Sequence, residues 1–388
     1  MEYAWLRRRN VLAGGGQLER ERVSGALRRL SILAGALVLL TACGQSTSTS
    51  STSAANAKSV ADMGGMDALI AAAKKEGTLN VIALPPDWAN YGVTITAFQT
   101  KYGIHVNSAA PNDSSQQEVD AIGTLAGTSR APDVVDVGMA VALKNVDRFA
   151  PYQVATWGDI AASSKEPTGL WVQDYSGAMA IGYDSSKVPA ITSIQDLLGS
   201  AFKSKVALPG NALGSNQAVN SIMEVSLNNG GSLDDISKGV DFFKQLKANG
   251  NWVNVIGTTA TVKEGTTPVL FEWDYNSQTH VKDVPTWKLF LPANPVVAAY
   301  AQAINKGAPH PAAARLWEEY LYSNAGQNEF LRGGAHPVRM AAMTAAGSVD
   351  AAAAAALPPV KGTPVFMSDD QAASANSYLK DNWSKAMG

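Results

Sequence analysis

Acidic and aromatic residues occur together at several places in the sequence, each directly after a short apolar run. Asp87, Trp88 and Tyr91 form one such group, and Trp273-Asp274-Tyr275 forms the most concentrated one. Aromatic faces attract cations, and carboxylates pair with cations. The combination therefore predicts a binding site for a small amine-bearing molecule.

Further candidate ligand-binding residues follow other apolar runs. They are Met139, Tyr175, Asn211 and Ser215. Gly214-Ser215-Asn216 stands at a predicted helix start, where free backbone N–H groups bind carboxylates or phosphonates.

Each of these residues also has a purely structural interpretation. Asp87 is suited to cap the helix that follows it, and Asn211 and Ser215 are suited to a turn and a helix cap. The tryptophans and tyrosines of these groups are of types that are mostly buried for packing. For Asp274, ligand contact is favoured over the structural interpretation. Burial of an acidic side chain between two aromatic residues costs free energy unless the carboxylate has a partner.

The sequence has none of the common catalytic or metal-binding motifs. It lacks H-E-x-x-H, G-x-S-x-G, a Walker loop and a cysteine cluster. The four histidines, at 105, 280, 310 and 336, do not pair at the spacing of metal ligands. We therefore expect no catalytic residue, no metal and no cofactor. The alternative is a surface-anchored hydrolase that uses cleft carboxylates, since their separation is a three-dimensional quantity.

Alternating strands and helices are needed to position these residues. Apolar runs predict strands at 79–84, 105–109, 134–137, 171–174, 178–183, 206–208 and 269–273. Helical patterns lie at 66–76, 93–102, 115–125, 193–198, 232–250 (with Ser232 and Asp235 as a capping box), 311–322, 351–356 and 370–387. This order indicates an α/β fold with a mixed, mostly parallel sheet, in which ligands bind at the carboxyl ends of the strands.

Residues 30–43 have the features of an export signal. They read L-S-I-L-A-G-A-L-V-L-L-T-A-C, follow Arg28-Arg29 and end at Cys43, the one cysteine in the sequence. A basic flank, a short apolar core and small residues before a cut site are typical of a secretory signal. The segment resembles a bacterial lipobox, which implies lipidation of Cys43 after removal of residues 1–42. An ordinary signal peptide with a chance cysteine is the alternative. The signal is complete without residues 1–22, so we expect translation to start nearer Val23 than Met1.

Composition indicates an exported globular protein with no nucleic-acid partner. Of the 388 residues, 46% are hydrophobic and 16% are charged. Removal of residues 1–42 takes away seven basic and three acidic residues, which changes the net charge from −2 to −6. Nucleic-acid binding requires a basic face, so this charge argues against it. The Ser/Thr-rich residues 43–65 predict a flexible tether between the membrane and the folded body.

Several stretches resemble those of bacterial ABC-importer solute-binding lipoproteins with the type 2 periplasmic-binding fold. The branch includes binders of polyamines, ferric iron and aminoethylphosphonate. The resemblance covers about residues 66–387, and the stretches that carry it are 71–84, 181–189, 194–198, 202–209 and, most specifically, 303–323.

The resemblance implies two lobes that close on a ligand, with crossover strands near 174–177 and 292–295. Lobe 1 would comprise residues 66–175 and 295–388, including the C-terminal helices, and lobe 2 residues 176–294. The resemblance also implies a monomer that is exported, held on the outer side of the cytoplasmic membrane by lipid on Cys43, and docks on an ABC permease. An adhesin without a small ligand is a further alternative, which the two-lobe pattern disfavours.

The ligand motifs of two known classes are absent at the matching positions. Ferric-iron binders carry adjacent tyrosines where residues 220–227 read N-S-I-M-E-V-S-L. Polyamine binders carry Trp-x-Asp where this chain has Ala298-Ala299-Tyr300. Trp273-Asp274-Tyr275 is suited to replace that motif from another loop. The expected solute is therefore amine-bearing, either a polyamine of the spermidine/putrescine kind or an aminophosphonate.

Overall fold

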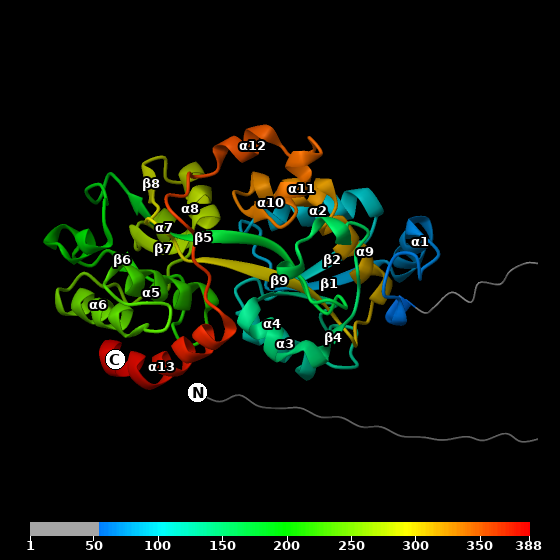
Figure 1. Ribbon diagram of the computed structural model, residues 1–388, viewed down its shortest axis with the longest axis horizontal. Helices are drawn as coiled ribbons and strands as arrows, with labels where there is room; N and C mark the ends of the chain where they lie inside the picture. Colours follow the sequence, from blue (N-terminus) through cyan, green and yellow to red (C-terminus); the bar gives the residue numbers. More distant parts are fainter. Residues whose placement is uncertain (1–53) are drawn as a thin grey trace, which may run out of the picture. The chain divides into compact units, whose positions relative to one another are not determined.

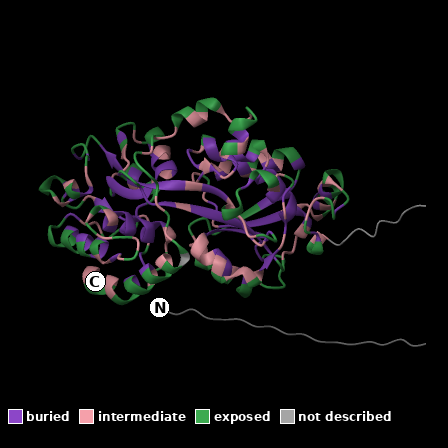
Figure 2. Cartoon of the chain, viewed as in Figure 1, coloured by how far each residue is buried: buried purple, intermediate pink, exposed green. Residues whose placement is uncertain are grey.

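A computed structural model describes residues 54–388 (Figure 1). The predicted signal peptide, Cys43 and residues 43–53 of the predicted tether lie outside the described residues. Two long antiparallel strands, β5 (Val172–Asp184) and β9 (Val297–Asn305), run through the middle of the folded body. Both strands are buried along most of their length, whereas α6, α12 and α13 expose their outer sides (Figure 2).

Strand β5 belongs to two sets of strands. Its first half pairs with β9, and its second half, from Met179, pairs with β7 and β8. A β-bulge between Gln173 and Ser176 lies before this change of partners. The other strands are β3 (Val134–Gly138) and β4 (Phe149–Ala150) beside β9, β10 (His336–Pro337) beside β5, β7 (Val269–Trp273), β8 (Trp287–Phe290) and β6 (Val206–Ala207) beside β7.

We call the elements around β3 and β9 lobe 1. Strands β1 (Thr78–Ile82) and β2 (His105–Ala109) form a parallel pair in this lobe. Helix α1 ends where Gly77 adopts a positive φ and donates its N–H to Ala73, and Pro311 stands in the first turn of α9. Helix α1 packs on α9, and Phe98 meets Trp317 in the core. The helices of lobe 1 are α1 (Met66–Glu76), α2 (Tyr91–Tyr102), α3 (Ser115–Thr124), α4 (Met139–Lys144), α9 (Pro311–Leu321), α10 (Asn324–Arg332), α11 (Met340–Ala345) and α12 (Ala351–Ala356).

We call the elements around β6, β7 and β8 lobe 2. Its central helix α5 is buried along most of its length between α6 and the sheet, and α13 packs mainly on α6. The helices of lobe 2 are α5 (Asn216–Asn228), α6 (Ser237–Ala248), α7 (Thr259–Glu264), α8 (Asp274–Thr279) and α13 (Asp369–Met387). Short 3-10 helices are η1 (Ala54–Asn56), η2 (Val146–Arg148), η3 (Trp157–Asp159), η4 (Ala162–Ser164), η5 (Ile194–Leu198), η6 (Ser200–Phe202) and η7 (His280–Lys282). Within residues 54–388, no helix combines the length and apolar character needed to cross a membrane.

Three segments connect the lobes. One is β5, the second is the return segment 292–297 before β9, and the third is the segment 361–367 between α12 and α13. The second and third run side by side, because Val297 N–H donates to Val365 O at 2.8 Å and Val365 N–H donates to Pro295 O at 3.0 Å. Helix α12 contacts α10 in lobe 1, whereas α13 contacts α6 in lobe 2, so the third segment passes from one lobe to the other.

Three predicted elements differ from the structure: two strands and one helix. Residues 171–174 and 178–183 are not separate strands, because the bulge in β5 lets one strand continue through both. The long helix predicted from Ser232 begins instead at Ser237. Residues Ser232 and Asp235 form a tight turn, and the Asp235 carboxylate accepts the N–H of Ser237 at 2.9 Å.

The sheet is mixed, but its pairing is less parallel than predicted. Among the described strands, the pairs β1–β2 and β6–β7 are parallel and the other six pairs are antiparallel. The difference arises from β5 and β9, which run in opposite directions between the lobes. Each strand that joins one of them in these pairs also runs antiparallel to it.

The predicted tether is too long at its C-terminal end. Residues 54–65 are ordered on lobe 1, with Ala57 fully buried. The buried Arg315 guanidinium donates to the carbonyl oxygens of Ala55 and Ala57 at 3.0 and 2.8 Å, and Gln153 N–H donates to Lys58 O at 2.8 Å. These bonds hold the segment because a buried guanidinium requires acceptors.

Candidate ligand-binding site

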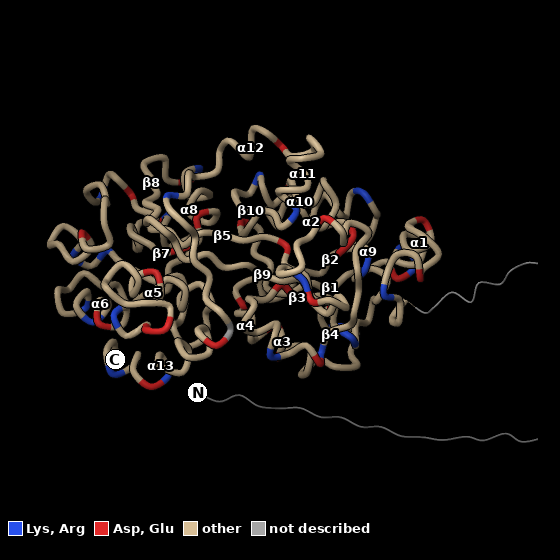
Figure 3. The backbone as a smooth tube through the Cα atoms, viewed as in Figure 1, with Lys and Arg blue, Asp and Glu red and all other residues tan. Residues whose placement is uncertain are grey.

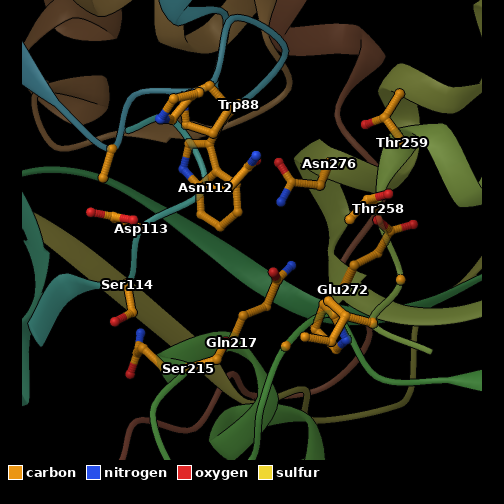
Figure 4. A pocket seen from close by; sticks show the side chains of 18 of the residues that line it. Trp88, Asn112, Asp113, Ser114, Ser215, Gln217, Thr258, Thr259, Glu272 and Asn276 are labelled. Atoms are coloured by element: carbon orange, nitrogen blue, oxygen red, sulfur yellow. The ribbon is translucent and has the colours of Figure 1, made fainter. Parts of the chain in front are cut away.

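A cavity of about 660 Å³ lies between the two lobes. It is bordered by segments that follow β1, β2, β6 and β7, as expected for an open α/β sheet, and by Asp136 within β3. Lobe 1 contributes residues 83, 85, 87–88, 111–115, 117–118, 136 and 300, and lobe 2 contributes 209–211, 214–217, 256–260, 270, 272, 276, 279 and 280. In Figure 4, Trp88, Gln217 and Asn276 point toward one another from different sides of the cavity.

The cavity wall is acidic. Carboxylates come from both lobes: Asp87, Asp113, Glu118, Asp136 and Glu272. Among the described residues that line the cavity there is no lysine or arginine. Basic residues lie instead on outer helices such as α6 (Figure 3). A cleft lined by one sign of charge concentrates solutes of the opposite sign, so the wall favours cations.

Asp136 is a buried carboxylate of lobe 1 that lines the cavity. Its Oδ2 accepts hydrogen bonds from Tyr91 OH at 2.8 Å and Tyr175 OH at 3.0 Å, whereas Oδ1 has no partner within the described residues. Burial raises the pKa of Asp136 to about 7. Burial, together with the neighbouring charge of Asp136, also raises the pKa of Glu118, whose Oε2 accepts the N–H of Asp136. A cation at this wall would lower both pKa values and take up the free acceptor.

Trp88 is held in a fixed orientation by three tyrosines. Its Nε1–H donates to Tyr175 OH at 2.7 Å. Its ring packs edge to face with Tyr275 and Tyr300, each at 5.6 Å between centroids, and Tyr175 stacks on Tyr300 at 5.7 Å. Because its neighbours fix it, Trp88 presents a preorganised aromatic surface to the cavity.

The N-terminus of α5 forms part of the lobe 2 wall. Ser215 caps the helix by accepting the N–H of Ala218 at 3.2 Å, and Asn211 accepts the N–H of Leu213 at 2.9 Å. Gln217, in the first turn, is 5% exposed, and its Nε2 has no partner among the described residues. This wall therefore offers an amide donor beside a helix N-terminus.

The two lobes touch at the edge of the cavity. Thr259 Oγ1 in lobe 2 donates to Asp87 Oδ2 in lobe 1 at 2.5 Å. A Cβ atom placed on Gly138 of lobe 1 would stand 2.9 Å from Asn216 Cγ of lobe 2. Contacts this close correspond to a closed arrangement of the lobes.

Four of the predicted ligand-binding residues line the cavity: Asp87, Trp88, Asn211 and Ser215. Asp87 does not cap α2, since Asn90 is the residue before that helix. The alternative roles of Asn211 and Ser215, in a turn and a helix cap, are present together with their place in the wall.

The other predicted residues lie outside the lining. Tyr91 and Tyr175 are fully buried behind it, where their hydroxyls hold Asp136. Met139 packs in a separate apolar cluster with Val135 and Ala142. None of these three residues therefore lines the cavity.

The Trp273-Asp274-Tyr275 group is also buried behind the wall. Asp274 accepts the N–H of Ala178 at 3.1 Å and lies 3.2 Å from His336 Nε2, so it joins α8 to β5 and β10. Trp273 Nε1 points to Tyr300 OH at 3.4 Å. The acidic residue between two aromatics has its partners within the protein, which is why it does not face the cavity.

Sequence analysis missed the lining residues that lie inside strands or helices. They include Glu118, Asp136, Gln217, Glu272, Asn276, His280 and Tyr300. Asp136 and Glu272 left a signal, because each is a single carboxylate within the apolar runs 134–138 and 269–273. An isolated charge in a buried strand requires either a partner or a ligand.

The sequence and the structure are both similar to those of known proteins. A family model described as "Bacterial extracellular solute-binding protein" matches residues 130–361. Iron-bound HitA from Pseudomonas aeruginosa is similar in structure, with a TM-score of 0.59, 19% identity, and coverage of 78% of this chain and 98% of that chain. AgtB from A. tumefaciens R10, in complex with agropinic acid, gives a TM-score of 0.62, 14% identity, and coverage of 80% and 98%. The ferric binding protein from Campylobacter jejuni gives a TM-score of 0.59 and 15% identity. The match covers 80% of this chain and 99% of that chain. A search of curated protein sequences gave no match.

Proposed function

Because the chain belongs to the family of bacterial extracellular solute-binding proteins, we propose that it captures a small amine-bearing solute between its lobes for an ABC importer. The family assignment and the structural neighbours establish a two-lobed type 2 periplasmic-binding protein, which is not an enzyme. Proteins of this kind are exported and deliver small solutes to a membrane permease. The amine character of the solute is what this proposal adds to the family assignment.

The acidic wall is the observation that supports an amine. Carboxylates approach the cavity from both lobes, and no lysine or arginine among the described lining residues neutralises them. Burying a charge is costly unless it is paired, so an ammonium group would offset the cost of these carboxylates. Trp88 adds an aromatic face, which attracts a desolvated cation by about 2 kcal/mol.

An acid group on the same solute has support from the opposite wall. The N-terminus of α5 and the unpartnered Gln217 Nε2 would receive a phosphonate or carboxylate. A polyamine would use the carboxylates of both lobes, whereas an aminophosphonate would use the acidic wall and the helix terminus. We propose that the protein binds either solute as a monomer.

A thermal-shift screen tests the proposal. Putrescine, spermidine and 2-aminoethylphosphonate are the amine probes, and acetate, phosphate and maltose are the controls. A ligand at 100 times its Kd stabilises the folded protein by about 2.7 kcal/mol, so at least one amine should raise the unfolding temperature clearly. A shift with the controls and none with the amines would contradict the proposed solute class.

We further propose that lipid on Cys43 anchors the protein. The lipobox-like segment before Cys43 supports this, as does the family's place outside the cytoplasm. In bacteria that produce the full chain, we expect the protein in the membrane fraction and a Cys43→Ser variant outside it. Labelled palmitate should enter the first protein alone. Equal partition of both into the membrane fraction would contradict the anchor.

A further inference from the structure

A buried ion pair stands in the lobe 2 wall, in addition to the carboxylates discussed above. His280 Nε2 lies 2.9 Å from Glu272 Oε2, and both residues line the cavity while being only 3% exposed. Glu272 uses one oxygen for this bond, and its Oε1 has no partner among the described residues. The pair therefore leaves one buried carboxylate oxygen free for another donor.

The surroundings of His280 fix its ring, and the carboxylates near it favour its charged form. Trp287 packs edge to face against the ring at 5.1 Å, and its own Nε1–H donates to Ser277. Burial acts to lower the pKa of His280, but the charge of Glu272 and the hydrogen bond to it raise that pKa above its ordinary value. The carboxylates of Asp87, across the cavity edge, and Asp283, after η7, act in the same direction.

The charges next to His280 are therefore mostly negative. Asp283 is itself paired with Lys263 at 3.0 Å and lies near the charge of Lys282. These two cations reduce the effect of Asp283 on the pKa of His280. Within residues 54–388, Glu272 on β7 is the one group in hydrogen-bond contact with the ring. When the imidazole is protonated, Glu272 is therefore its counter-ion.

We propose that His280 is a resident counter-ion of Glu272 and that a cationic solute takes its place, so that capture of the solute releases the proton of His280. This inference rests on the proposed function, since it requires an amine. The ammonium group donates to the free Oε1, Glu272 stays a carboxylate, and the imidazolium gives one proton to the solvent. His280 then remains as a neutral ring bonded to Glu272, which makes it a positioning residue for that carboxylate.

The direction of proton loss follows from the ordinary acidities of the two groups. Two cations beside one buried carboxylate repel each other, so one of them loses its charge. An alkylammonium has a pKa of about 10 and an imidazolium about 6.5, so the imidazolium is the group that yields. Binding of the ammonium group would thus be accompanied by loss of one proton from His280. The net charge of the site together with its solute would stay nearly constant.

Calorimetry with putrescine in two buffers of different ionisation enthalpy counts the protons released. Between pH 6 and 7, the protein should release about one proton more than a His280→Gln variant, whose amide still donates to Glu272 but carries no charge. Affinity should rise with pH by up to about tenfold per pH unit more in the protein than in the variant. His105→Gln, at an exposed strand residue, is the matched control and should behave as the unchanged protein.

The failures of the two proposals can be told apart. If His280→Gln binds putrescine and releases as many protons as the unchanged protein, the counter-ion role is overturned and the amine site stands. If neither protein binds an amine, the proposed solute class fails and the exchange fails with it. NMR titration of the free protein adds a readout without ligand. His280 should titrate above 6.5 and lower in Glu272→Gln, and titration at or below 6.5 in the free protein would overturn the pairing.

Discussion

An Asp136→Asn variant is expected to bind the amine solute about 30-fold or more weakly, and at the same time to unfold at a higher temperature above pH 7. Removal of one partner of a buried, hydrogen-bonded charge pair typically costs about 2–5 kcal/mol of binding free energy. Asp136 faces the cavity with an unpartnered Oδ1, so its charge is available to the solute. Calorimetry at pH 8, where the carboxylate is charged, measures the loss of affinity.

The expected stability change follows from the pKa of Asp136. Burial raises that pKa from 3.8 to about 7 in the folded protein. Between about pH 4 and 7 the folded state therefore keeps a proton that the unfolded state has lost, and the free energy of unfolding falls as the pH rises through this window. An asparagine does not ionise, so the variant escapes this loss. Thermal unfolding at pH 5 and pH 8 should show a gain for the variant at pH 8 and little difference at pH 5.

Asp174→Asn is the matched control. Asp174 is also buried, burial also raises its pKa, and it shares the Tyr91 hydroxyl with Asp136, but it does not line the cavity. Its variant should likewise gain stability as the pH rises above the ordinary pKa of an aspartate, and it should keep its affinity within about threefold. Equal losses of affinity in both variants would mean that the polar network behind the wall, and not the charge of Asp136, governs binding.

A Gly138→Leu variant is expected to bind about 100-fold more weakly without losing its fold. Gly138 ends β3 at the cavity, and even a Cβ atom there would stand 2.9 Å from Asn216 Cγ in the other lobe. A leucine side chain would hold the lobes apart, and a closed form populated at about 1% reduces apparent affinity about 100-fold. The φ of Gly138 is −59°, which any residue adopts, so the backbone is not strained. Calorimetry and small-angle X-ray scattering with solute should show weak binding and an open form.

Gly158→Leu provides the comparison for this wedge. Gly158 lies in η3, and a Cβ atom placed on it meets nothing within 4 Å. The substitution adds the same side chain away from the lobe contact, so affinity and closure should be unchanged. If Gly138→Leu binds within about threefold of the unchanged protein, the contact between β3 and α5 does not limit closure.

The parts of the fold that sequence reasoning found are those with strong local signals. Strands β2 and β7 and helix α12 have the predicted bounds, since turn residues or a pure alanine run delimit them. Strand β9 was not predicted, because its sequence V-A-A-Y-A-Q-A-I-N has few β-branched residues. Its place is set by pairing with β3 and β5, which lie far away in the sequence.

The candidate site shows the same limit at the scale of single residues. Asp87 and Trp88 were predicted from their position in the loop after a strand. This reasoning works because the carboxyl ends of strands meet at one edge of an α/β sheet. Trp273-Asp274-Tyr275 was predicted to contact the ligand, whereas its neighbour Glu272 is the residue that lines the cavity. Successive side chains in a strand point to opposite faces, so Leu270 and Glu272 face the cavity and Trp273 faces away. The sequence alone does not state which of the two faces is the open one.

The third connecting segment has a consequence for how the protein matures. Residues 361–367 bond to residues 294–297, and only after both have emerged is the set of connections between the lobes complete. Strand β9 of lobe 1 likewise pairs with β3, which was made more than a hundred residues earlier. A chain still being secreted therefore lacks a finished hinge, and its capacity to trap a solute begins only when residues 361–367 have left the translocation channel.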